Sequence, residues 1–290
     1  MQPFDYHEPS SLDEALSLLG EHRERARVLA GGTDLFLRMR TGVLRPAVVL
    51  DLKRIAGLDG IRESEEGGLR IGALTPHGDV EAAEAVRVRY PALASAARWV
   101  AGVQIRNRGT VGGNLCNASP AADLATPLLA FGARVRVAGL GWDRELPLEA
   151  FFVGPGRTVL APDEILTEIV LPPPAPWTGS DFQRAIRAAV DIALVNVAAT
   201  LTLEPGDGVC RDVRIALGAV APTPMLALAV AAALRGQRLT PEAIAAAARA
   251  AAAEARPISD VRASAEYRRD QVEVLTTRAL ERAFEVARSR

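Results

Sequence analysis

The chain has 290 residues, 49% of them hydrophobic and 24% charged, which is the balance of an ordinary globular protein. This length exceeds that of a usual single domain, so two or three compact units are expected. The formal net charge of −1 argues against the basic surface that nucleic acids or anionic membranes attract.

Residues 1–55 predict a small α/β lobe. Ser11 and Glu14 form a capping-box pattern at the start of a helix, and Gly20 is the expected residue just past its end. A strand, a second helix and a buried strand are predicted next, over residues 27–30, 34–40 and 47–52.

Residues 56–172 predict a larger lobe with a mixed sheet. Its strands are expected at 69–75, 133–138, 144–147 and 164–171. Its helices are expected at 79–86, 91–101 and 121–131, with Pro91 suited to a first helical turn and an irregular basic stretch at 104–109.

The proline-rich segment 171–176 predicts a linker, because consecutive prolines cannot donate to a sheet and favour extended backbone. Residues 173–290 then predict a three-stranded antiparallel sheet with helices. Strands are expected at about 192–203 and 213–220, followed by alanine-rich helices broken near Gly236 and Pro257. The predicted fold class is α+β, a two-lobed domain followed by this C-terminal domain.

The most apolar stretch, 225–253, is interrupted by charged residues, glycine and proline. It cannot supply the roughly 20 uninterrupted apolar residues of a membrane span. The first residues lack the basic and apolar regions of a secretory signal. A cytoplasmic protein without a membrane span is expected.

Cysteine and histidine usage argues against a metal site. Two cysteines, Cys116 and Cys210, cannot supply four thiolates to an iron–sulfur cluster, and the three histidines are scattered. Cys116 is interpreted as an inert buried thiol. Lys53 is the only lysine, which is attributed to coding bias.

Two glycine pairs carry the strongest signal, Ala30-Gly31-Gly32-Thr33-Asp34 and Thr110-Val111-Gly112-Gly113-Asn114. Glycine pairs permit unusual backbone angles and close approach to a ligand, and their free amides form an anion site to which a threonine adds a donor. Two such loops suit a ligand with adjacent phosphates, such as a dinucleotide. Neither loop has the glycine spacing of a Rossmann motif or the lysine of a P-loop, and two ordinary tight turns are the alternative. Asp34 is interpreted as a helix cap or structural carboxylate, because a carboxylate would repel phosphate.

These residues together resemble the FAD-binding medium subunit of the molybdenum hydroxylase family, which includes xanthine dehydrogenase and bacterial carbon monoxide dehydrogenase. The resemblance covers essentially the whole chain. It rests on the two loops and on the segments 118–123, 151–152, 163–166, 191–195 and 266–268.

The resemblance implies which residues bind FAD. Asp123 is expected to accept a hydrogen bond from the adenosine part, and Ile165 and Leu166 to pack on the adenine. The phosphate-binding residues it implies are Ala30, Gly31, Gly32, Thr33, Asp34, Leu35, Thr110, Gly112, Gly113 and Asn114. No catalytic residue and no metal ligand is assigned.

The chain departs from the family just after the linker. The family places a lysine near the flavin pyrimidine edge, where this chain has Gln183 or Arg184. An aromatic residue that some members place near the flavin corresponds to Val100, beside Trp99. A cation near the N1/C2 edge stabilises reduced anionic flavin, so these departures bear on the flavin potential and on the electron acceptor.

The resemblance implies an electron-transfer subunit of a hetero-oligomer, with a [2Fe–2S] small subunit and a molybdopterin-binding large subunit as partners. FAD would relay electrons from the clusters to NAD or a quinone-type acceptor. Three alternatives stay open: a stand-alone FAD-dependent oxidoreductase, a binding module for another phosphate ligand, and a non-catalytic scaffold. The lack of a convergent His, Tyr or Glu constellation counts against the first.

Overall fold

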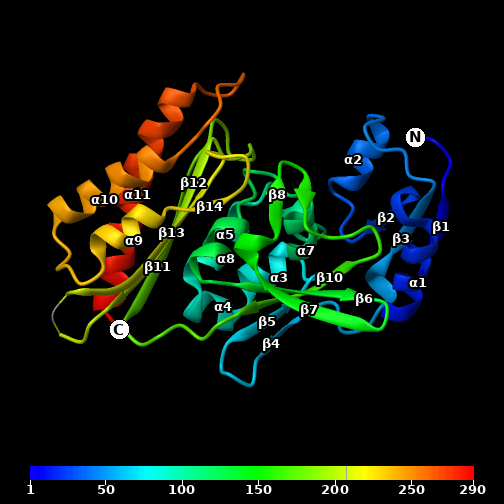
Figure 1. The fold of residues 1–290 in the computed structure, drawn as a ribbon, viewed down its shortest axis with the longest axis horizontal. Helices are drawn as coiled ribbons and strands as arrows, with labels where there is room; N and C mark the ends of the chain where they lie inside the picture. The colour runs from blue at the N-terminus through cyan, green and yellow to red at the C-terminus, as the bar shows by residue number, and fades with distance from the viewer. Residues whose placement is uncertain (207) are drawn as a thin grey trace.

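A computed structural model describes residues 1–206 and 208–290. Three units, each built on its own main sheet, follow one another along the long axis of the molecule (Figure 1). The α+β class predicted from the sequence is confirmed.

The N-terminal unit is a parallel three-stranded sheet in the order β1-β3-β2. Its strands are β1 (Asp5–His7), β2 (Ala26–Leu29) and β3 (Val48–Asp51), and its helices are α1 (Leu12–His22) and α2 (Leu35–Arg40), with 3₁₀ turns at Arg23–Arg25 and Leu52–Arg54. The sheet is the parallel unit expected when a helix connects neighbouring strands.

Helix α1 begins as predicted, because the Ser11 side chain accepts a hydrogen bond from the Glu14 amide. The predicted stop at Gly20 is wrong. The helix continues through Gly20 to His22 and ends where Arg23 adopts a φ of 44°. A glycine inside a helix costs only about 1 kcal/mol, so tertiary packing of the buried residues on α1 can extend the helix past it.

The second unit holds a five-stranded sheet in the order β4-β5-β10-β6-β7, in which every neighbouring pair is antiparallel. The predicted mixed sheet is therefore corrected to an antiparallel one. Its strands are β4 (Ile61–Glu63), β5 (Leu69–Gly72), β6 (Arg134–Gly139), β7 (Trp142–Pro147) and β10 (Ile165–Leu171), and a separate pair is formed by β8 (Phe152–Gly154) and β9 (Arg157–Thr158).

The second unit also contains six short helices, of which α7 packs on strand β10. They are α3 (His77–Ala82), α4 (Glu84–Arg89), α5 (Pro91–Trp99), α6 (Val103–Arg106), α7 (Val111–Cys116) and α8 (Ala125–Ala130), and a 3₁₀ turn spans Leu148–Ala150. Tyr90 lies at the centre of the core, where its ring meets that of Phe131 edge-on and its hydroxyl donates to the Pro172 carbonyl at 2.8 Å. The buried aromatic ring thus keeps a partner for its polar end.

The C-terminal unit has four strands in the order β11-β12-β13-β14, one more than predicted. They are β11 (Thr178–Ala185), β12 (Val195–Leu203), β13 (Cys210–Gly218) and β14 (Met225–Leu226). The extra strand is two residues long and directly follows the turn that contains Pro222 and Pro224. It is too short to show the alternating pattern that predicts a strand.

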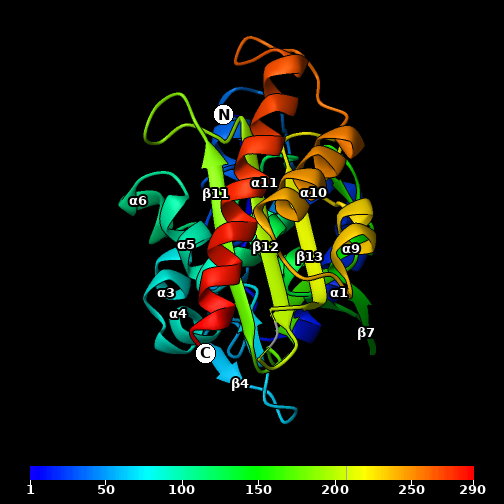
Figure 2. The same ribbon diagram turned by 90° about the vertical axis from the view of Figure 1, so that its left-hand side faces the viewer.

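Helices α9 (Leu228–Leu234), α10 (Pro241–Glu254) and α11 (Ala265–Arg288) lie on one face of the C-terminal sheet, and α5 and α8 pack on the other (Figures 1 and 2). Contact with α11 is close: a Cβ on Gly179 would lie 1.9 Å from the Ala283 carbonyl oxygen. A backbone hydrogen bond also joins this unit to the second one, since the Ala219 amide donates to the Pro120 carbonyl at 2.6 Å. The C-terminal sheet is therefore clamped between its own helices and those of the middle unit.

Candidate cofactor site

The first glycine loop connects the end of β2 to the start of α2. It follows a strand of a parallel sheet directly, so it lies at the carboxyl edge of that sheet, where ligands of such sheets commonly bind. Gly32 has a φ of +79°, the left-handed region that favours glycine. A glycine is thus required by the turn itself.

Five consecutive backbone amides of this loop are open. Within residues 1–206 and 208–290, none of them donates a hydrogen bond, whereas the next amide, that of Phe36, donates to the Gly32 carbonyl at 3.1 Å. The five belong to Gly31, Gly32, Thr33, Asp34 and Leu35. Successive free N–H groups in a tight turn form a concave site for an anion, and the residues present here therefore fit a phosphate group.

The second glycine loop differs from the prediction, because its amides are already used. Val111 donates to the Thr75 carbonyl, Gly112 donates to the Ala73 carbonyl at 2.8 Å, and Gly113 donates to the Thr110 hydroxyl oxygen at 3.1 Å. The loop is the N-terminal turn of α7 with Thr110 as its cap. The expected second set of free amides is not present.

Two side-chain groups of the second loop keep hydrogen-bonding capacity. In the part of the chain that the structure describes, the Thr110 hydroxyl accepts a hydrogen bond but donates none, and the Asn114 side-chain oxygen is buried without a partner. Buried polar atoms are rarely left unpaired. The unpaired Asn114 oxygen is an acceptor that calls for a donor such as a ligand hydroxyl, whereas the Thr110 hydroxyl can still donate, so the two groups fit a polar ligand at this position.

The two glycine loops touch each other. A Cβ on Gly31 would lie 1.9 Å from the carbonyl oxygen of Arg108, and one on Gly113 would lie 3.9 Å from the Ala30 side chain. The prediction that the two loops come together is therefore confirmed. Because Gly31 has no side chain, the open amides can lie directly against the segment that leads into Thr110.

His77 supports this junction from behind. Its backbone amide donates to the Gly109 carbonyl at 3.0 Å, and its ring packs against Gly109. Burial and, to a smaller extent, the nearby positive charge of Arg106 lower the pKa of His77 to about 4. The ring is neutral at physiological pH, so it adds no charge to the loops.

Asp34 does not act as a helix cap. It occupies the N-cap position of α2, but its side chain makes no capping hydrogen bond. Burial raises its pKa above the usual value, and Arg38 opposes the rise. The capping alternative of the prediction is therefore wrong, the alternative of a structural carboxylate stays a prediction, and the Asp34 backbone amide is one of the five open ones.

Asp123 lies in a buried polar cluster that joins the second and third units. Its two carboxylate oxygens accept hydrogen bonds from Arg184 at 2.9 Å and from Asn196 at 3.2 Å. Burial raises the pKa of Asp123 to about 6, against the lowering effects of Arg184 and Asn196. In this structure its partners are protein groups, and its predicted contact with adenosine stays a prediction.

The Arg184 side chain contacts the second unit, whereas the Gln183 side chain bonds within its own strand. The Arg184 side chain is only 2% exposed and donates to the carbonyls of Trp99, at 2.7 Å, and Asp191. Its guanidinium lies over the Trp99 ring, 5.6 Å from the ring centroid. Gln183 bonds to Asp181, so Arg184 is the one of the two that reaches the second unit. Which of them takes the place of the family lysine stays a prediction.

Ile165 and Leu166 lie in the hydrophobic core. They begin β10 and are 3% and 4% exposed, Ile165 in the cluster around α1 and Leu166 in the main core of the second unit. Neither offers an open apolar surface in this structure, so their contact with adenine stays a prediction.

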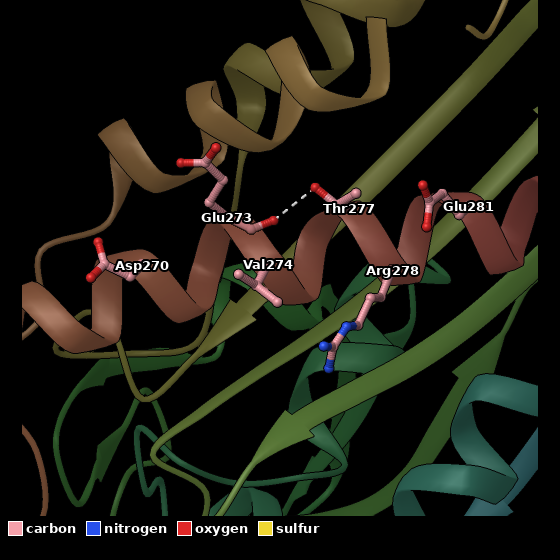
Figure 3. A pocket seen from close by; sticks show the side chains of 6 residues that line it. All are labelled: Asp270, Glu273, Val274, Thr277, Arg278 and Glu281. Atoms are coloured by element: carbon pink, nitrogen blue, oxygen red, sulfur yellow. Dashed lines mark hydrogen bonds between the residues drawn. The ribbon is translucent and has the colours of Figure 1, made fainter. Parts of the chain in front are cut away.

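Two surface hollows lie away from the glycine loops. One, of about 380 Å³, lies between α1 and the β6–β7 hairpin and includes Trp142 and Asp163. The other, of about 470 Å³, runs along the outer face of α11 (Figure 3). It is lined by Asp270, Glu273, Val274, Thr277, Arg278 and Glu281. These mostly charged side chains form a solvated helix face and offer no convergent set of groups.

Sequence reasoning missed two residues beside the site. No sequence pattern pointed to Asn196, because its hydrogen-bond partner Asp123 is distant in the chain. Lys53 contacts the first loop, and its uniqueness as the only lysine was the signal that could have drawn attention to it.

The fold and the open loop define a two-lobed phosphate-binding protein with a C-terminal sheet domain, and comparisons with known proteins specify it further. Residues 2–174 match the FAD binding domain in molybdopterin dehydrogenase, and residues 180–283 match the CO dehydrogenase flavoprotein C-terminal domain. The chain belongs to this family of FAD-binding medium subunits of molybdenum hydroxylases.

Two relatives with known names match this chain over nearly its whole length. The carbon monoxide dehydrogenase medium chain of Hydrogenophaga pseudoflava is 36% identical, covering 97% of each chain. The xanthine dehydrogenase FAD-binding subunit of Escherichia coli O157:H7 is 34% identical, covering 97% of this chain and 96% of the relative.

Solved structures give the same result. A carbon monoxide dehydrogenase structure from Hydrogenophaga pseudoflava matches with a TM-score of 0.94 at 36% identity, covering 98% of this chain and 99% of that chain. Quinoline 2-oxidoreductase from Pseudomonas putida 86 matches with a TM-score of 0.92 at 30% identity, covering 99% and 98%. Among the residues described, no helix is both long enough and apolar enough to cross a membrane.

Proposed function

We propose that this chain is an electron-transfer subunit that binds FAD between its two glycine loops. It would receive electrons from a [2Fe–2S] partner chain, while a molybdopterin-binding chain oxidises the substrate, and pass them to NAD or a quinone-type acceptor. Its membership of the family and the names of its relatives, which are medium chains or FAD-binding subunits of dehydrogenases, support this assembly. A cytoplasmic location stays a prediction.

The observation that carries the proposal is the run of open amides from Gly31 to Leu35. A diphosphate needs several donors within a short span, and five adjacent N–H groups supply them without a lysine. From the opposite loop, Thr110 would add its hydroxyl hydrogen, and Asn114 would add an N–H of its side-chain NH₂ group. Gly31 and Gly32 allow the loop to take this shape, because a Cβ on either residue would collide with neighbouring protein atoms.

Arg184 is the proposed cation of the flavin end. Bound FAD supplies the redox chemistry, since its isoalloxazine ring can take up and release electrons. Arg184 is held by Asp123, by two carbonyls and by the Trp99 ring, so its position is fixed before a ligand arrives. Because Asp123 offsets its net charge, Arg184 would act through its fixed N–H groups, which favour a nearby developing negative charge without reorganisation.

Reconstitution with FAD tests the proposal. The purified full chain is incubated with excess FAD, freed of unbound cofactor, and examined for flavin absorbance and for its FAD-to-protein ratio. A ratio near one is expected. A folded chain that stays colourless and gives no binding heat in calorimetry would contradict FAD binding. Purification with its native partner chains, followed by an acceptor screen with NAD and a soluble quinone, identifies the electron acceptor.

A further inference from the structure

Lys53 lies beside the first glycine loop, in the 3₁₀ turn Leu52–Arg54 that follows β3. Its ammonium nitrogen Nζ lies 2.7 Å from Oδ1 and 2.6 Å from Oδ2 of Asp51. The same nitrogen lies 3.4 Å from the carbonyl oxygen of Ala30, the first residue of the loop. Lys53 therefore bridges the end of β3 and the start of the loop.

Asp51 is a buried charge that Lys53 neutralises. It is 5% exposed, and its carboxylate also accepts hydrogen bonds from the Tyr6 hydroxyl at 2.6 Å and from the Lys53 amide at 3.0 Å. Burial raises the pKa of Asp51, but the hydrogen bonds from Lys53 and Tyr6 outweigh burial and leave the pKa below its usual value. The carboxylate is therefore ionised at neutral pH.

The position of Asp51 makes its charge relevant to the loop. In the parallel sheet Asp51 pairs with Leu29, the residue immediately before Ala30. An unneutralised carboxylate at this edge would repel phosphate at the adjacent amides, because unlike a surface charge it is poorly screened by water. A carboxylate paired with an ammonium group carries no net charge toward the loop.

We propose that Lys53 is a positioning residue of the diphosphate site, which neutralises Asp51 and fixes the Ala30 carbonyl so that the loop amides stay open to an anion. This inference rests on the proposed binding of FAD diphosphate by the first loop. It assigns Lys53 no direct contact with FAD.

The test compares FAD affinity of the full chain and its variants by quenching of FAD fluorescence. Lys53→Met should weaken FAD binding about fivefold to tenfold at low salt, since a partly exposed ion pair contributes modestly. Arg54→Met is the matched control: it removes a positive charge from the same turn, but Arg54 is 67% exposed and pairs with Glu8. It should leave FAD affinity within twofold of wild type.

A second substitution separates neutralisation from direct contact. Adding Asp51→Asn to Lys53→Met should restore most of the lost affinity, because the repelling charge is gone. An unchanged affinity in Lys53→Met, or no recovery in the double variant, would overturn the inference. If Lys53→Met fails to fold, the double variant and Lys53→Arg take its place in the test. The FAD affinity of both should lie within about threefold of wild type. A wild-type chain that binds no FAD would instead contradict the proposed function.

Discussion

Gly31 packs so closely against Arg108 that a Cβ at residue 31 would lie 1.9 Å from the Arg108 carbonyl oxygen. Two segments far apart in the sequence thus meet backbone to backbone. The contact places the open amides of the first loop beside the threonine cap of the second, and it makes a glycine indispensable at this position.

Gly31→Ala should impair FAD binding and folding stability together. The neighbouring atom is backbone and cannot move aside, so overpacking should lower the free energy of unfolding by about 1–3 kcal/mol. FAD titration and chemical denaturation measure the two effects. Gly20→Ala is the control: nothing lies within 4 Å of its added Cβ, and in helix α1 it should raise stability by about 0.5–1 kcal/mol. Wild-type FAD affinity in Gly31→Ala would contradict the described packing.

Thr110→Val should weaken FAD binding beyond its effect on helix stability. The substitution removes the cap of α7 and the hydroxyl donor proposed for the ligand, and the lost cap alone should cost about 1 kcal/mol. Thr240 caps α10 in the same way, accepting from the Ala243 amide at 3.2 Å, and lies in the C-terminal unit. Thr240→Val should therefore lose similar stability with unchanged FAD affinity. Equal affinity losses in both variants would show that Thr110 acts only through folding.

Asp123 should give the protein a measurable pH dependence of stability. Its pKa of about 6 in the folded chain exceeds the usual value near 4 of an unfolded chain. The folded state therefore holds more protons between these values, and the contribution of Asp123 to stability falls as pH rises from about 4 to 6.

Asp123→Asn removes this titration and isolates it. The free energy of unfolding of wild type relative to Asp123→Asn, measured by denaturant titration at several pH values, should decrease through that window. A difference that rises with pH would contradict the raised pKa. At neutral pH, Arg184→Met should lower the free energy of unfolding by about 3–5 kcal/mol, because it leaves an uncompensated buried carboxylate. This loss should exceed that of Asp123→Asn.

His77 should act in the opposite direction. Its pKa is about 4 in the folded chain against about 6.5 when unfolded, so the unfolded state binds more protons between these values. The contribution of His77 to stability is present above pH 6.5 and is lost as pH falls toward 4.

The contact between the two glycine loops should weaken as the stability contribution of His77 is lost. FAD retention after gel filtration should fall between pH 6.5 and 4 in wild type and fall less in His77→Gln, whose side chain does not become charged. His7→Gln, in β1, serves as the control and should follow wild type. A His77→Gln profile identical to that of wild type would contradict this role.

Local sequence chemistry predicted much of the fold. The capping pattern at Ser11, the proline linker and the alternating strands depend on nearby residues, and the structure contains the corresponding elements. The helix that passes Gly20 and the short strand β14 escaped prediction, because packing between distant segments decides both. The boundaries at residues 55 and 172 stay predictions.

The candidate site was predictable only where it depends on backbone freedom. Gly-Gly pairs signal close approach, and this led to the two loops and their proximity. The occupied amides of Gly112 and Gly113 could not be foreseen, because their acceptors include the Ala73 carbonyl and the side chain of the preceding Thr110. Similarly, the pairing of Asp123 with Arg184 depends on how the third unit docks on the second.

The Asp123–Arg184 pair has a consequence for exchanging parts between relatives. Each half of the ion pair belongs to a different domain match, Asp123 to residues 2–174 and Arg184 to residues 180–283. A chimaera that joined one half of this chain to the other half of a relative would keep this ion pair only if the relative supplied the opposite charge at the same place on its side of the seam. The two halves are therefore expected to have adapted to each other as a matched set, and successful recombination would have to transplant both sides of the seam.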